Sequence, residues 1–151
     1  MDKNVIISLK GIQSIYEKES DTIELVTEGT YSKKDDAYYV TYNESEVTGM
    51  KGTTTVLKVL EDRVTIVRYG TVNSEFVFEK GQKHLSYFDT AQGAFTIGVI
   101  TKEMDVKVDD SGGEIRVGYM LDIDNDNASS NSLLMKIKET GRTDEKYNGD
   151  N

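Results

Sequence analysis

The chain contains no cysteine, no proline and no tryptophan, and it has one histidine, His84, among its 151 residues. Without cysteine there can be no disulfide, no thiolate nucleophile and no zinc or iron–sulfur site with cysteine ligands. One histidine also excludes a histidine-rich metal site. Because proline is absent, glycine, asparagine and aspartate must form the turns. The sequence therefore predicts a protein without a metal ion or other cofactor.

Positive charge is scarce as well, because 27 acidic residues against 18 basic ones give a net charge of −9. Proteins that bind nucleic acids or anionic membranes need a basic surface, which this balance does not favour. No apolar run approaches the roughly 18 residues of a membrane span. The N-terminus also lacks the parts of a signal peptide. We expect an acidic, cytoplasmic protein that binds neither nucleic acid nor membranes.

The length suits a single domain with one hydrophobic core. The last segment, residues 140–151, contains one aromatic and no aliphatic side chain. Such a segment buries too little apolar surface to offset the entropy lost on ordering. We expect one domain over residues 1–139 and a disordered, acidic and polar C-terminal tail over residues 140–151.

Apolar and polar residues alternate along most of the chain, as Ile115 and Val117 do with Glu114 and Arg116. Alternating segments rich in Val, Ile, Thr and Tyr and bounded by turn residues predict β-strands. Short links indicate an antiparallel up-and-down meander, and closing so wide a sheet removes its exposed edges. We expect an all-β barrel of eight to nine strands over residues 4–17, 22–33, 37–44, 53–60, 63–72, 75–90, 93–109, 113–123 and 132–139.

Two of these segments also show helical spacing of apolar residues, namely residues 9–16 and residues 133–137. Gly11 weakens a helix in the first segment. The second segment also alternates with period two, so we interpret both as strands. The segment of residues 75–90 has an alternative interpretation as two strands separated at Gly81.

The register of one hairpin follows from its turn at Glu61-Asp62, whether the loop has two or four residues. One face then carries three directly opposed pairs: Val59 with Val64, Leu57 with Ile66, and Thr55 with Arg68. Opposed residues share a face of the sheet. Because this face is apolar near the turn, we expect it to line the barrel interior.

This register places Arg68 on the inner side, where an isolated charge would be costly. In the preceding strand Tyr42 and Glu44 share a face, so Glu44 is the natural partner of Arg68, with the Tyr42 hydroxyl nearby. Two interpretations follow. The cluster either closes one end of the barrel, or it anchors a carboxylate or phosphate at the base of a ligand cavity. The candidate ligand-binding residues are Arg68, Glu44, Tyr42 and Thr55.

His84, Ser86 and Asp89 include the residue types of a catalytic triad, but nothing in the sequence supplies a nucleophile elbow. His84 and Ser86 share one face of the predicted strand. We expect His84 at the surface or at a pocket rim. The sequence therefore names no catalytic residue, and we expect that the protein is not an enzyme.

The segment Asp122-x-Asp124-x-Asp126 resembles the start of a calcium-binding loop. Its sixth position is Asn127, where glycine is needed, and its twelfth is Leu133, where a bidentate glutamate is needed. We therefore expect no metal site, with a weak adventitious calcium site as the alternative. Phosphate-binding glycine motifs are absent too.

The chain also carries an ordered series of short motifs: Gly29-x-Tyr31, Tyr39-Val40-Thr41-Tyr42-x-Glu44, Gly49, Thr55-x-x-Lys58-Val59, Val64-x-Ile66-Val67-Arg68-x-Gly70, Phe78-x-x-Gly81, Tyr87-x-x-Thr90-x-x-Gly93 and Thr101. Together they resemble the YwiB-like family of small bacterial proteins, mainly from Firmicutes, which have a domain of unknown function. The resemblance covers residues 4–139. It implies a calycin-like barrel, the architecture of lipocalins and fatty-acid-binding proteins, and no assigned activity. Lipocalin ligands do not carry over, because the lipocalin Gly-x-Trp signature needs a tryptophan.

Two functions remain in view. The first is a non-enzymatic binder of an unknown small molecule, anchored near Arg68, Glu44 and Tyr42. The second is a structural or protein-interaction module with a filled barrel, as a monomer or a homodimer joined through an edge strand or the aromatic face around Tyr39. An enzyme that uses Glu44, Arg68 or His84 has the least support. We favour the binder.

The bulk of the interior should distinguish the binder from the filled barrel. Tyr31 and Phe95 are large enough to fill the barrel. Gly29, Thr55 and Gly98 would leave room for a ligand.

Overall fold

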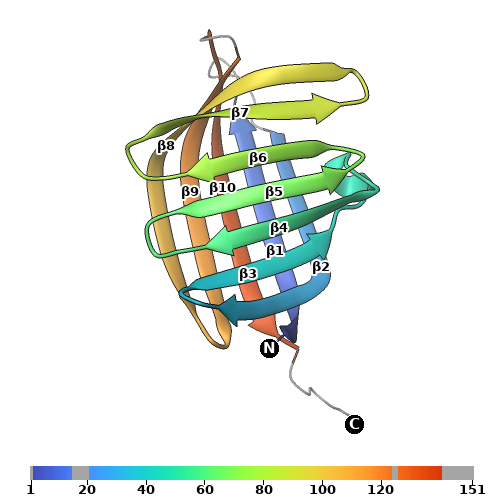
Figure 1. The fold of residues 1–151 in the computed structure, drawn as a ribbon, viewed down its shortest axis with the longest axis vertical. Helices are drawn as coiled ribbons and strands as arrows, with labels where there is room; N and C mark the ends of the chain where they lie inside the picture. The colour runs from blue at the N-terminus through green and yellow to red at the C-terminus, as the bar shows by residue number, and fades with distance from the viewer. Residues whose placement is uncertain (1, 15–20, 124–125, 141–151) are drawn as a thin grey trace.

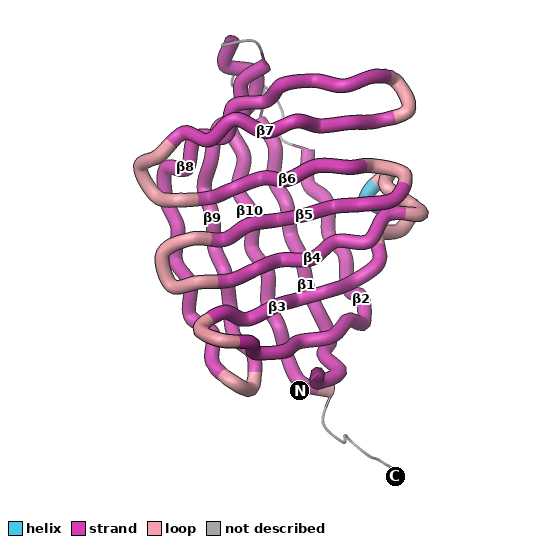
Figure 2. The backbone as a smooth tube through the Cα atoms, in the orientation of Figure 1, coloured by secondary structure: helices cyan, strands magenta, loops and turns pink. Residues whose placement is uncertain are grey.

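The computed structural model describes residues 2–14, 21–123 and 126–140. They form ten strands: β1 (Asp2–Ser14), β2 (Asp21–Lys34), β3 (Ala37–Asn43), β4 (Thr53–Val59), β5 (Val64–Gly70), β6 (Asn73–Phe78), β7 (Lys83–Thr90), β8 (Gly93–Asp109), β9 (Gly112–Ile123) and β10 (Asp126–Glu139). One short 3-10 helix, η1 (Glu46–Thr48), follows β3. Figure 2 shows how fully strands account for the described chain. Within that part, no helix has the length and apolarity needed to cross a membrane.

Every described strand pairs antiparallel with its neighbours in sequence, and β1 pairs with β10 to close the barrel. In Figure 1, β3 to β6 lie across the long strands β1, β9 and β10. This arrangement confirms the predicted all-β, antiparallel up-and-down barrel. The tail was expected to be disordered over residues 140–151, of which the structure describes Thr140 alone. Residues 141–151 lie outside the described residues, as do residues 15–17 of the first expected strand.

The strand count differs from the expected eight to nine because residues 75–90 form two strands. A turn separates β6 from β7, and Gly81 adopts φ 80° in it, a conformation that costs glycine little. The two strands then pair only at Asn73 with Asp89 and at Ser74 with Phe88. β6 and β7 therefore leave a seam in the barrel wall along most of their length.

Both segments with helical spacing are strands as predicted, the first over residues 9–14, since its residues 15 and 16 lie outside the described residues. β1 and β10 pair continuously from Val5 with Glu139 to Ser14 with Ser130. Leu9 faces Met135 across this ladder, and both side chains belong to the hydrophobic core or pack against it. Cross-strand packing therefore overrides the local helical pattern.

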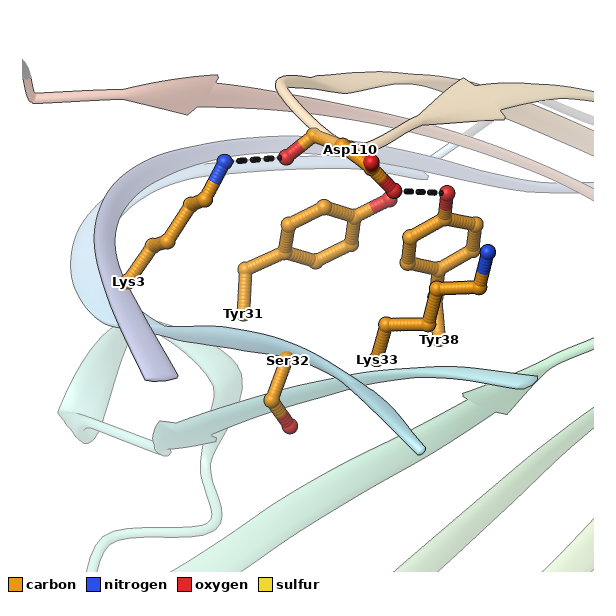
Figure 3. A pocket seen from close by; sticks show the side chains of 6 residues that line it. All are labelled: Lys3, Tyr31, Ser32, Lys33, Tyr38 and Asp110. Carbon is orange, nitrogen blue, oxygen red and sulfur yellow. Dashed lines mark hydrogen bonds between the residues drawn. The ribbon is translucent and has the colours of Figure 1, made fainter. Parts of the chain in front are cut away.

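Two aromatic side chains stack at one end of the barrel. The ring centroids of Tyr31 and Tyr38 are 5.1 Å apart, and Figure 3 shows both rings among the side chains that line a pocket here. The Tyr31 hydroxyl donates to the Asp109 carbonyl at 2.7 Å, and the Tyr38 hydroxyl donates to an Asp110 carboxylate oxygen at 2.6 Å. Lys3 Nζ donates to the Asp110 carbonyl at 2.8 Å. These bonds tie β1 and the β2–β3 hairpin to the β8–β9 turn, beside a pocket of about 190 Å³ that the same side chains line.

The β4–β5 hairpin has the predicted register, with Val59 opposite Val64 and Thr55 opposite Arg68. Its loop spans the four residues 60–63, and the Leu60 N–H donates to the Arg63 carbonyl at 2.8 Å. The predicted inner face is buried in the structure, apart from the partly exposed end of Arg68. The polar pair of this hairpin, Thr55 and Arg68, therefore lies on the inner face at the end away from the turn.

Candidate ligand-binding site

Three neighbouring strands bring the predicted anchor residues together. Tyr42 on β3 is directly opposite Thr55 on β4, and Thr55 is directly opposite Arg68 on β5. Glu44 follows the last residue of β3, and its N–H donates to the Thr53 carbonyl at 2.8 Å, which keeps it beside β4. All four candidate residues therefore meet on the inner face. Their role in binding a ligand stays a prediction.

The cluster is organised around the Glu44 carboxylate. Arg68 Nε lies 3.6 Å from Glu44 Oε2. Thr55 Oγ1 donates a short hydrogen bond to the same oxygen. The Glu44 side chain is 1% exposed and that of Arg68 is 16% exposed, so the charges lie almost entirely inside the protein. The structure thus pairs the two residues as expected.

The two tyrosines nearest the ion pair are held in their neutral form. Burial, followed by the negative charge of Glu44, raises the pKa of Tyr42, and Arg68 opposes this only in part. Burial also raises the pKa of Tyr119, again against the charge of Arg68. The tyrosines therefore offer uncharged hydroxyls, and the local charge is that of the ion pair.

A cavity of about 190 Å³ lies against this cluster inside the barrel. Its polar lining comprises Tyr42, Glu44, Thr48, Arg68 and Tyr119. The remaining walls are mostly apolar and include Leu9, Leu57, Ile66, Phe76, Leu133 and Met135. Ligand pockets typically combine such apolar walls with a few placed polar groups. One cavity thus lies inside the barrel beside the ion pair, and a pocket of similar volume, about 190 Å³, lies by the stacked tyrosines.

The space does not come from the two glycines that were expected to provide it. The Cβ position of Gly29 is already occupied by the Ile7 side chain and the Thr41 carbonyl oxygen. Gly98 lies on the outer face, beneath the side chains of Lys83 and Asp122. The prediction that these two glycines leave interior room was therefore wrong. At Gly29 neighbouring atoms already occupy the space of a side chain, and Gly98 lies on the outer face of the barrel.

Gly11 supplies the room instead. It lies on the inner face of β1, lines the cavity, and a Cβ added there would meet no atom within 4 Å. Tyr31 fills space as predicted, since it is 1% exposed, whereas Phe95 is 44% exposed and does not. The sequence signal for Gly11 was its place in line with Val5, Ile7 and Leu9 on alternate positions of one strand.

Four buried polar atoms have no hydrogen-bond partner among the described residues: Glu44 Oε1, Arg68 Nε, Ser74 Oγ and Ser86 Oγ. Ser74 on β6 is directly opposite Arg68, so it extends the polar band beyond the predicted cluster. Ser86 lies on the inner side of β7, two residues before Phe88. Buried polar groups in proteins are nearly always paired, so this band is suited to water or to a bound polar group.

A known family covers almost the whole barrel. The family model described as Domain of unknown function (DUF1934) matches residues 7–135. The chain belongs to this family. Its membership confirms the resemblance proposed from the ordered motifs.

Relatives of the chain are β-barrels too. The uncharacterized beta-barrel protein YwiB of Bacillus subtilis (strain 168) is 26% identical over 110 residues, which cover 72% of this chain and 76% of the relative. A crystal structure of the ywiB protein from Bacillus subtilis superposes with a TM-score of 0.81 at 20% identity, covering 91% of this chain and 92% of that chain. These similarities support the fold and leave the function open.

The His84 side chain is 30% exposed and pairs with Glu79, and it is not among the residues that line the described cavity. Its Nε2 is 3.0 Å from Glu79 Oε1, which Arg63 Nη2 also approaches at 3.3 Å. The hydrogen bond from His84 is the main cause that lowers the pKa of Glu79. Asp89 is on the opposite face of β7 from His84 and Ser86, so the three residues do not form a triad.

Asp122 is committed to an ion pair, with Lys83 Nζ 2.9 Å from its Oδ2. The next residue of the calcium-like segment, Asp124, lies outside the described residues. Among the residues that the structure does describe, no three potential ligands are grouped to hold a metal ion. The alternative of an adventitious calcium site stays untested.

Proposed function

We propose that this protein is a non-enzymatic barrel that binds a small molecule in its internal cavity, with Glu44, Arg68, Tyr42 and Thr55 as the polar anchor. The observation that carries the proposal is an apolar-walled cavity of about 190 Å³ that ends on a buried ion pair. An apolar cavity of about 150 Å³ accepts benzene. Usual ligand pockets span about 300–1,000 Å³, so the ligand is small.

Barrel architecture supports this proposal. A barrel of this size is either filled by side chains or left with room for one small ligand. Here Tyr31 and Phe78 are fully buried, while Gly11 leaves space next to the ion pair. We also propose that the barrel is of the calycin type, whose members include ligand carriers, although fold alone assigns no ligand.

Native mass spectrometry of gently purified protein, beside a denatured sample of the same batch, tests the proposal. We expect an additional mass on the folded protein that is lost on denaturation. A bare mass in both samples, together with no binding of added small alcohols, acids or amines, would contradict it.

A second candidate function is a protein-interaction module. Leu85 and Tyr87 project from the outer face of β7 and are 71% and 76% exposed. They lie beside the β6–β7 seam, the one place in the described barrel where the ladder shrinks to two residue pairs. A dimer mass that Leu85→Ser and Tyr87→Ser abolish, without any bound small molecule, would favour this function.

A further inference from the structure

The charges and hydrogen-bonding atoms of the buried Glu44–Arg68 ion pair indicate which head group a ligand would have. We infer that this head group is uncharged and both donates and accepts hydrogen bonds, as an alcohol or a primary amide does. The inference rests on the proposed ligand-binding function. Arg68 alone would suggest a carboxylate or a phosphate as the head group. We expect a neutral polar group in place of either anion.

Charge balance is the first argument. The charged residues that line the described cavity are Glu44 and Arg68, and they lie 3.6 Å apart. Their charges offset each other, so an additional anion would meet Glu44 and an additional cation would meet Arg68. An unpaired charge in a buried site is costly. A neutral head group avoids that cost.

Hydrogen-bonding capacity is the second argument. Glu44 Oε2 accepts from Thr55, and the Tyr42 hydroxyl also interacts with the Glu44 carboxylate, whereas Glu44 Oε1 has no hydrogen-bond partner among the described residues. Arg68 Nε is also without an acceptor, because 3.6 Å is too long for a hydrogen bond. The site therefore lacks one donor and one acceptor. A single hydroxyl group supplies both.

The apolar lining of the cavity indicates the chemistry of the rest of the ligand. Leu57, Ile66, Phe76, Leu133 and Met135 surround the space beyond the ion pair. Apolar walls favour an aliphatic or aromatic body, because transfer of apolar surface out of water is favourable. The ligand class is thus a small amphipathic molecule with a neutral polar end.

Three probes with the same six-carbon chain test the inference: n-hexanol, hexanoate and hexylammonium. Each is titrated into the protein near pH 7, and binding is followed through the NMR signals of cavity methyl groups. We expect n-hexanol to bind at least about tenfold more tightly than either ion. Equal or tighter binding of hexanoate or hexylammonium would overturn the inference and leave the proposed function intact. No binding of any probe would overturn both.

Two variants make the charge argument specific. Glu44→Gln leaves Arg68 unbalanced and should shift the preference toward hexanoate. Arg68→Gln leaves Glu44 unbalanced and should shift it toward hexylammonium. Thr55→Val removes a hydrogen bond but no charge, so it should keep the preference for n-hexanol. Unchanged preferences in whichever charge variant folds would contradict the inference.

Discussion

The two carboxylate oxygens of Glu44 differ in their hydrogen bonding. Its Oε2 has both Thr55 and Arg68 as neighbours, and its Oε1 has no partner among the described residues. A protein that needed this ion pair only to plug its barrel would gain more from apolar side chains of similar volume. The incomplete pairing is the reason why we propose that this residue contacts a ligand.

The ion pair should be costly to break and cheaper to replace. Glu44→Leu leaves Arg68 without its partner and should lower the free energy of unfolding by about 3 kcal/mol. The double variant Glu44→Leu/Arg68→Met should lose less than Glu44→Leu alone, because no charge is then left unpaired. Urea denaturation measures the wild-type protein, both single variants and the double variant. A double variant that loses the sum of the two single losses would contradict this coupling.

Tyr38 should make the protein sensitive to alkaline pH. The hydrogen bond to Asp110, with burial and the nearby acidic charges, raises the pKa of Tyr38 to about 12. A phenol in the unfolded chain titrates near 10. The folded state therefore holds this proton more tightly, so its contribution to stability is complete below about pH 10 and is lost as the pH rises to 12.

Tyr38→Phe should accordingly flatten the fall in the free energy of unfolding between about pH 10 and 12. Denaturant titrations at several pH values measure the slope. Tyr39→Phe, on the opposite face of β3, controls for the removal of one phenol. If the free energy of unfolding fell equally steeply with pH in the wild-type protein and in Tyr38→Phe, the contact with Asp110 would not raise the pKa of Tyr38.

Among the strand pairs of the described barrel, β6 and β7 share the shortest ladder, which leaves the seam between them. The two strands share two residue pairs, while β5–β6 share five and β7–β8 share eight. Phe76 and Phe88 bridge the seam with ring centroids 6.1 Å apart. Phe76 also lines the cavity, so the seam lies next to the proposed ligand.

Amide hydrogen exchange should reveal this seam. Amides of residues 75–78 and 84–87 that face across it lack ladder partners and should exchange faster than those inside the β4–β5 ladder. Exchange measured by NMR at single-residue resolution checks this. Equal protection in the seam and in the β4–β5 ladder would show that the wall is continuous in solution.

The sequence predicted the β4–β5 register because two adjacent alternating runs and one turn determine it. That register placed Thr55 and Arg68 together, and the alternation of Tyr42 and Glu44 in the preceding strand identified Glu44 as the partner. Ser74 escaped notice because its position depends on the β5–β6 pairing. Gly11 escaped because its cavity exists only once β1 has closed onto β10.

The errors have a related cause. Alternation along one strand tells which residues share a face, but the coiling of neighbouring strands decides whether a glycine leaves a void. Gly29 has no side chain, yet Ile7 and the Thr41 backbone already occupy that space. Only the assembled barrel separates such a close approach from a cavity.

At the scale of the whole molecule, the barrel has two unlike ends. At one end the stacked Tyr31 and Tyr38 bond to the β8–β9 turn and line a pocket with the charged side chains of Lys3, Lys33 and Asp110. The other end contains the cavity, and η1 and the loop after it contribute Thr48 and Met50 to its lining. We therefore expect a ligand to reach the ion pair from the η1 side or through the β6–β7 seam.

Filling the cavity tests the central claim most directly. Gly11→Leu adds a side chain where a Cβ meets no atom within 4 Å and leaves the ion pair untouched. Gly118→Ala is the matched control, because its Cβ would point outward to ordinary contact with Glu103 at 3.6 Å. Native mass spectrometry then measures the occupancy of the bound small molecule, n-hexanol included, in each folded protein.

We expect Gly11→Leu to remain folded and to lose the bound mass, while Gly118→Ala keeps it. Retention of the bound mass at wild-type occupancy in folded Gly11→Leu would contradict the claim that the barrel interior is the binding site.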